Sequence, residues 1–65
     1  MKLCIKEVRE EVGIRITELA RRSGVSQSYL SELEAGKKKN VSMTILCRLA
    51  KALDVHVSVL FNCDE

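Results

Sequence analysis

A glycine at position 24 stands between two short amphipathic segments, and this arrangement most constrains how the chain can fold. Ile16 and Leu19 precede it at helical spacing, and Leu30 and Leu33 follow it in the same way. Glycine adopts a left-handed backbone conformation without the Cβ clash that other residues suffer. It can therefore end one helix and redirect the chain. We predict two short helices joined by a tight turn.

The residues after Gly24 predict how the second of these helices begins. Val25 turns back into the core, and the Ser26 hydroxyl can accept a hydrogen bond from a free amide in the first turn of the helix. The result over about residues 16–35 is a helix-turn-helix. Its second helix has the shape and chemistry to enter a DNA major groove.

The composition predicts one small helical domain over residues 1–65. The 65 residues include no proline and three glycines, and helix-forming residue types are abundant. Only Tyr29 and Phe61 are aromatic, so the core must be aliphatic. A chain of this length is close to the lower limit for a core held by packing alone. It leaves no room for a catalytic cleft and has no candidate catalytic dyad, so we do not expect an enzyme.

Three further helices complete the predicted all-α, compact five-helix domain. One precedes the helix-turn-helix and ends at Gly13, one runs from an N-cap at Ser42 to Asp54, and a short one follows. The apolar residues that mark them are Ile5, Val8 and Val12; Met43, Leu46, Cys47, Leu49, Ala50 and Leu53; and Val57, Leu60 and Phe61.

The net charge of +2 is mild, and the cysteine pattern indicates the cellular compartment. Cys4, Cys47 and Cys63 are odd in number and show no C-x-x-C pairing, which fits a reducing cytoplasm and argues against a zinc site. We read Cys47 as a small hydrophobic residue in a helix. No signal peptide or bilayer-spanning apolar run is present. We expect no metal, no cofactor and no membrane partner.

From about Ile5 to Phe61 the chain resembles the Cro/repressor-type (Xre-like) helix-turn-helix family. The shared pattern is Gly13-Ile14, Glu18-Leu19-Ala20, Gly24-Val25-Ser26, Leu30-Ser31-x-Leu33-Glu34-x-Gly36-Lys37, Leu46, Leu49-Ala50-Lys51-Ala52-Leu53 and Leu60-Phe61. The resemblance implies a lambda-repressor-like domain of five helices, with the second and third forming the DNA-binding unit. It also implies that Arg9 and Glu34 form a buried ion pair between helices 1 and 3; the alternative is two solvent-exposed charges.

Two departures from the family pattern lie at the start of the second helix. Family members often have Ser or Thr as the N-cap and a phosphate-binding Gln next, where this chain has Arg15 and Ile16. Arg15 cannot cap the helix and its charge opposes the helix dipole, although it would lie near the DNA backbone. Ile16 cannot make the usual bond to phosphate.

The expected DNA contacts fall into two groups. The predicted base-contacting residues are Gln27, Ser28, Ser31 and Glu32. The predicted phosphate-contacting residues are Arg15, Ser26, Lys37, Lys38, Lys39 and Asn40. The alternatives are an ordinary polar helix surface for the first group and a solvated loop for the lysine run. We read Arg21, Arg22, Arg48 and Lys51 as solubilising.

A domain of this size contacts few base pairs, so useful specificity calls for two copies on two half-sites. Val59, Phe61 and His56 are the predicted dimer contacts. The favoured function is a sequence-specific double-stranded-DNA-binding transcriptional regulator, a homodimer on a palindromic operator, with no small-molecule effector. An antitoxin or a restriction–modification controller protein fits equally well. The alternative from another class is a protein interaction module that has lost DNA binding, supported by Glu32 and Ile16.

Overall fold

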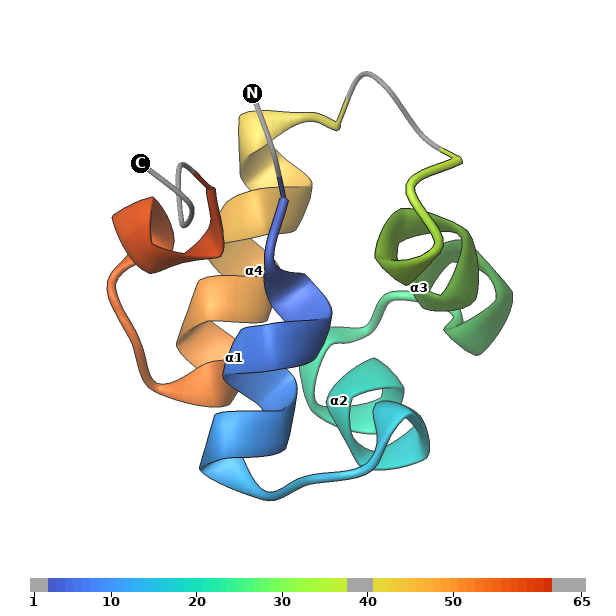
Figure 1. The fold of residues 1–65 in the computed structure, drawn as a ribbon, viewed down its shortest axis with the longest axis horizontal. Coiled ribbons are helices and arrows are strands. Elements are labelled where there is room, and N and C mark those ends of the chain that lie inside the picture. Colours follow the sequence, from blue (N-terminus) through green and yellow to red (C-terminus); the bar gives the residue numbers. More distant parts are fainter. Residues whose placement is uncertain (1–2, 38–40, 62–65) are drawn as a thin grey trace.

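Four α-helices and one 3₁₀ turn make up the fold in a computed structural model that describes residues 3–37 and 41–61 (Figure 1). In chain order they are α1 (Ile5–Val12), α2 (Ile16–Ser23), α3 (Gln27–Glu34), α4 (Met43–Leu53) and the 3₁₀ turn η1 (Val57–Leu60). Within these residues the only β pairing is an isolated antiparallel bridge between Leu3 and Phe61. The all-α prediction is confirmed.

The helices begin and end where the local sequence favours it. The Ser26 and Ser42 hydroxyls accept hydrogen bonds from Tyr29 N (3.1 Å) and Ile45 N (3.2 Å), as N-caps of α3 and α4. Asp54 ends α4 in the left-handed conformation at φ 59°. Asp is one of the few non-glycine residues that tolerate this region, so the predicted ends of α4 are confirmed.

The end of α3 is a Schellman motif. Gly36 has φ 76°, its amide bonds to the Leu33 carbonyl (3.2 Å), and the Lys37 amide bonds to the Glu32 carbonyl (2.9 Å). These bonds satisfy carbonyls that the last turn of a helix otherwise leaves unpaired. The carbonyls at the end of α3 are therefore hydrogen-bonded, and the chain leaves the helix at Lys37 in a defined direction.

The core is aliphatic and draws on every element. Its buried residues are Ile5, Leu19, Val25, Leu30, Leu33, Leu46, Leu49, Ala50, Leu53 and Leu60. Each fully buried leucine or isoleucine stabilises the fold by roughly 1.5–3 kcal/mol before entropy is counted. Tyr29 and Phe61 pack only at the margin of this cluster. The two halves of the helix-turn-helix are thereby attached to α1 and α4 through one core.

The predicted fifth helix is a single 3₁₀ turn, so the five-helix count is corrected to four α-helices and η1. The Val59 amide bonds to the His56 carbonyl, three residues back, at 3.1 Å. The Leu60 carbonyl accepts instead from the Cys4 amide (2.9 Å), and the next residue is extended and bridges to Leu3. This pairing with the N-terminal segment leaves room for only one turn.

Three residues predicted on apolar stripes are exposed. Met43 (56% exposed) and Cys47 lie on a ridge of α4 that leads to Lys51, to one side of the buried Leu46–Leu49–Leu53 face. Val12 (41% exposed) is the last residue of α1. A periodicity of three and four residues could not separate the centre of each stripe from its edge.

Candidate nucleic-acid interface

The turn between α2 and α3 is held by Ser23, whose hydrogen bonds were not predicted from the sequence. The buried Ser23 hydroxyl donates to the Leu19 carbonyl (2.7 Å) and accepts from the Val25 amide (3.2 Å). Gly24 takes φ 73° and bonds to the Ala20 carbonyl (3.0 Å), while Val25 packs into the core. One hydroxyl thus links the last turn of α2 to the chain entering α3. A serine directly before a helix-ending glycine is the signal that could have revealed it.

One face of α3 is polar and exposed. The four predicted base-contacting residues are all exposed, and they are Gln27, Ser28, Ser31 and Glu32. Leu30 and Leu33 are buried on the opposite face. Because side chains three and four positions apart share a helix face, the four polar residues form one surface over two turns, which we call the reading face.

A bidentate ion pair joins α1 to the end of α3. Arg9 Nε donates to Glu34 Oε2 at 2.9 Å, and Arg9 Nη2 donates to Glu34 Oε1 at 3.1 Å. Arg9 Nη1 also donates to the Ile14 carbonyl at 2.9 Å, between α1 and α2. The two side chains are only 13% and 10% exposed. We call this group the latch; it ties three segments together and fixes α3 relative to α1.

The electrostatics of the latch follow from its geometry. The hydrogen bonds to Glu34 raise the pKa of Arg9 above its ordinary value, and the charges of Glu34 and Glu10 act in the same direction against burial. The pair with Glu34 therefore favours the charged form of the guanidinium. Its planar fork matches the carboxylate, which a lysine could not do.

Two predicted phosphate-contacting cations flank the helix-turn-helix. Arg15 is the residue before α2, exposed and extended (φ −83°, ψ 158°), and its side chain makes no capping bond. Lys37 is exposed just after α3. Ser26 accepts from Tyr29 N, which leaves its hydroxyl proton to donate elsewhere. Lys38, Lys39 and Asn40 lie outside the described residues.

Ile16, which replaces the phosphate-binding glutamine of the family pattern, packs half-buried against the core. Its side chain therefore adds to the fold and offers no hydrogen bond at the start of α2. Any contact of that end with an anion would come from Arg15 or from backbone amides.

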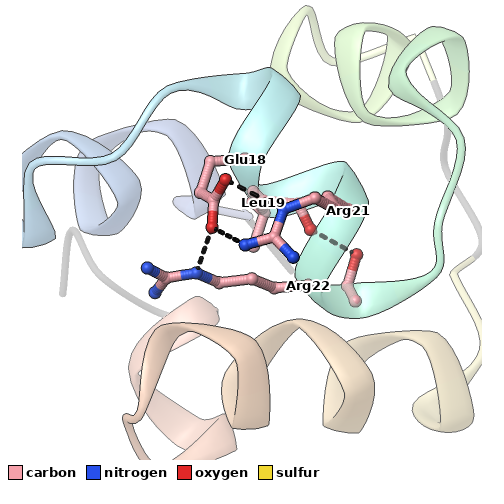
Figure 2. Close-up of polar contacts among 5 residues, drawn as sticks. Glu18, Leu19, Arg21 and Arg22 are labelled. Atoms are coloured by element: carbon pink, nitrogen blue, oxygen red, sulfur yellow. Dashed lines mark hydrogen bonds and ion pairs between the residues drawn. The ribbon is translucent and has the colours of Figure 1, made fainter.

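A second arginine–glutamate cluster lies along α2, and sequence reasoning missed it (Figure 2). Arg22 Nε donates to Glu18 Oε2 at 2.7 Å, while Arg21 contacts Glu18 through both Nε (3.1 Å to Oε1) and Nη2. Hydrogen bonds first from Arg21 and then from Arg22 lower the pKa of Glu18 to about 2. Spacings of three and four residues from Glu18 were the available signal. Two cations first read as solubilising are partly neutralised here.

The predicted dimer contacts lie at the C-terminal end of the described chain. Val59 is 43% exposed, His56 is exposed and Phe61 is half-buried. His56 Nδ1 accepts from the Ser58 amide at 3.2 Å and caps η1. The turn therefore presents one large apolar side chain to solvent.

Neither a metal site nor a membrane span is found in the part of the chain that the structure describes. No three His, Cys, Asp or Glu side chains gather closely enough there to hold a metal ion. No helix in it is long and apolar enough to cross a bilayer.

Comparison with known proteins gives consistent matches. Residues 5–60 match the family described as helix-turn-helix. The chain is 41% identical over 58 residues to the HTH-type transcriptional regulator SinR of Bacillus licheniformis, covering 89% of this chain and 52% of the relative. It is 40% identical to SinR of Bacillus subtilis over the same shares of both. The chain thus spans about half the length of these curated relatives.

Solved structures match the whole fold. The restriction-modification controller protein C.AhdI from Aeromonas hydrophila aligns with a TM-score of 0.80 and 37% identity, covering 88% of this chain and 85% of that one. The N-terminal DNA binding domain of SinR from Bacillus subtilis aligns with a TM-score of 0.80 and 41% identity, covering 94% and 86%. SinR in the SinR–SinI complex aligns with a TM-score of 0.82 and 40% identity, covering 89% and 56%.

Proposed function

The chain belongs to the helix-turn-helix family, and from this premise we propose that it is a sequence-specific, double-stranded-DNA-binding transcriptional regulator of the cytoplasm. The observation that carries the proposal is the reading face, four exposed polar residues on a capped helix whose angle the latch fixes. The matched relatives are transcriptional regulators, and one matched structure is a DNA binding domain. This supports a binding function and no enzymatic one.

The reading face supplies the chemistry for direct base readout. Gln27 can make a bidentate contact to adenine, and Ser28 and Ser31 can pair with several base edges in the major groove. Glu32 can accept from the amino group of cytosine. These residues occupy the first two turns of α3, the part of a recognition helix that enters the groove.

Phosphate contacts set the position and the salt dependence. Arg15 and Lys37 lie at opposite ends of the helix-turn-helix, and both are exposed. In our proposal Lys38, Lys39, Asn40 and the Ser26 hydroxyl join them. Contacts of this kind bind every sequence alike and release counterions, so affinity falls as salt rises.

The proposed active form is a homodimer on a palindromic operator. One copy of a domain this small reads too few base pairs for useful specificity. Val59, with Phe61 and His56 beside it, is the proposed twofold contact. Val59→Glu would place like charges across the axis and leave the core intact. We expect sedimentation to shift toward monomer; an unchanged dimer would place the interface elsewhere.

A controller of a restriction–modification system is one more specific form of this function, because the matched structure C.AhdI is such a controller. An antitoxin that regulates its own operon is an equal proposal. The SinR–SinI complex shows a relative with a protein partner. An interaction module without DNA binding remains the competing proposal, because Glu32 brings an acid to the reading face.

Gel shifts with a mixed DNA pool at several salt concentrations separate these proposals. A DNA-binding regulator should shift the pool at low salt and lose affinity steeply as salt rises. Lys37→Ala should flatten the slope of log K against log salt by up to about one unit. An interaction module would give no shift at any salt concentration.

A further inference from the structure

Two cations on α4 stand apart from the interactions described above. Arg9 pairs with Glu34, and Arg21 and Arg22 pair with Glu18, whereas Arg48 and Lys51 make no ion pair within residues 3–37 and 41–61. Both border a shallow hollow of about 390 Å³ that Met43, Thr44 and Cys47 also line. Met43 is 56% exposed, more than Val12 or Val59. The outer side of α4 is thus both apolar and basic.

The outer side of α1 has the opposite charge. Glu7 and Glu11 are exposed, and neither forms an ion pair with a residue that the structure describes. Like charges four residues apart destabilise a helix slightly, and an acid in the last turn opposes the helix dipole. Glu7 lies in the first turn, which the helix dipole favours, but no ion pair within the described residues offsets the charge of either carboxylate.

We propose that the α4 face (Met43, Cys47, Arg48 and Lys51) binds the α1 face (Glu7 and Glu11) of a second copy of this chain. Charge complementarity argues for this occupant, because two cations meet two carboxylates. Glu7 and Glu11 are about 6 Å apart along their helix axis, and Arg48 and Lys51 about 4.5 Å. The long side chains can therefore form both pairs at once.

The arrangement of the helices determines the type of contact. α1 crosses in front of α4 and packs against it, so their outer sides point in opposite directions (Figure 1). One copy can then use its α4 face on one neighbour and its α1 face on another. Such a head-to-tail contact does not close at two copies, unlike a twofold contact through Val59. It goes beyond the proposed DNA-binding function and can be tested without DNA.

Sedimentation velocity of the full chain without DNA tests the contact. We expect species larger than two copies at low ionic strength and their loss at high ionic strength, because exposed ion pairs are screened. Arg48→Glu with Lys51→Glu, and separately Glu7→Lys with Glu11→Lys, should each abolish these species. Mixing the two double variants should restore them, because the reversed faces complement each other. Lys6→Glu with Lys37→Glu changes the net charge by the same amount and is the control. More of the large species should remain in this control than in Arg48→Glu with Lys51→Glu.

The proposal is overturned if large species persist in both double variants, if the mixture does not restore them, or if the wild type never exceeds two copies.

Discussion

Two arginine–glutamate clusters in this small domain use the same chemical groups in different surroundings. The latch joins α1 to α3, and its side chains are 13% and 10% exposed. The cluster on α2 joins neighbours on one helix, and Arg21, Arg22 and Glu18 are 72%, 44% and 31% exposed. The latch holds three segments of the chain at fixed positions, whereas the α2 cluster only adds to a helix that already exists. The number of ion pairs is therefore a poor guide to their contribution to stability. That contribution depends on which segments a pair connects and on how far its side chains are shielded from solvent.

The largest expected effect is that of Arg9→Met. Breaking a fully buried pair from one side costs about 3–5 kcal/mol. Because the latch keeps some exposure, we expect a loss of about 2–3 kcal/mol in the free energy of unfolding. Glu34 and the Ile14 carbonyl would both lose their donor. Denaturant melts provide the measurement. An unchanged midpoint of the denaturant melt would show that the latch contributes no more to stability than the exposed cluster on α2.

Glu34→Gln should have the intermediate effect. The amide keeps the shape of the side chain and one acceptor oxygen, but it loses the charge that Arg9 faces. We expect a loss of about 1–2 kcal/mol, measured by the same melts. The matched control is Glu32→Gln, two residues earlier on α3, where the side chain is exposed. A control as damaging as Glu34→Gln would show that charge on α3, and not the latch, is being measured.

The smallest effect should follow from Glu18→Gln, and it should depend on pH and salt. The pKa of Glu18 is lowered from 4.5 to about 2, so its ionised form is favoured in the folded protein. The contribution is therefore fully present above about pH 4.5 and disappears as the pH falls toward 2. Melts of parent and variant should differ slightly at neutral pH and low salt, and converge in acid or high salt. A difference that grows in acid would contradict this assignment.

The sequence predicted features that depend on local chemistry. Ser26, Ser42, Gly24 and Asp54 were placed correctly at helix ends because the residue type alone favours each conformation. Family membership, which the resemblance predicted, is confirmed by the match over residues 5–60.

Other features depend on packing and could not be predicted in this way. The 3₁₀ form of η1 depends on the Cys4 amide reaching the Leu60 carbonyl, a pairing between the two ends of the described chain. The exposure of Met43 and Cys47 depends on which side of α4 meets the core. The role of Ser23 depends on hydrogen bonds to the backbone of Leu19 and Val25, and that of Glu18 on the arginine side chains three and four residues later.

Selection of bound sequences from a random DNA pool tests the central claim, that the reading face specifies sequence while the latch holds it in place. We predict an enriched site with two related half-sites. Gln27→Ala should cost about 1–3 kcal/mol on that site and relax selection at one base pair per half-site. Lys37→Ala, the control, should weaken binding to all sequences alike. The account would be contradicted if the parent protein enriched no sequence from the pool. It would also be contradicted if Gln27→Ala enriched the same site and bound it with the affinity of the parent.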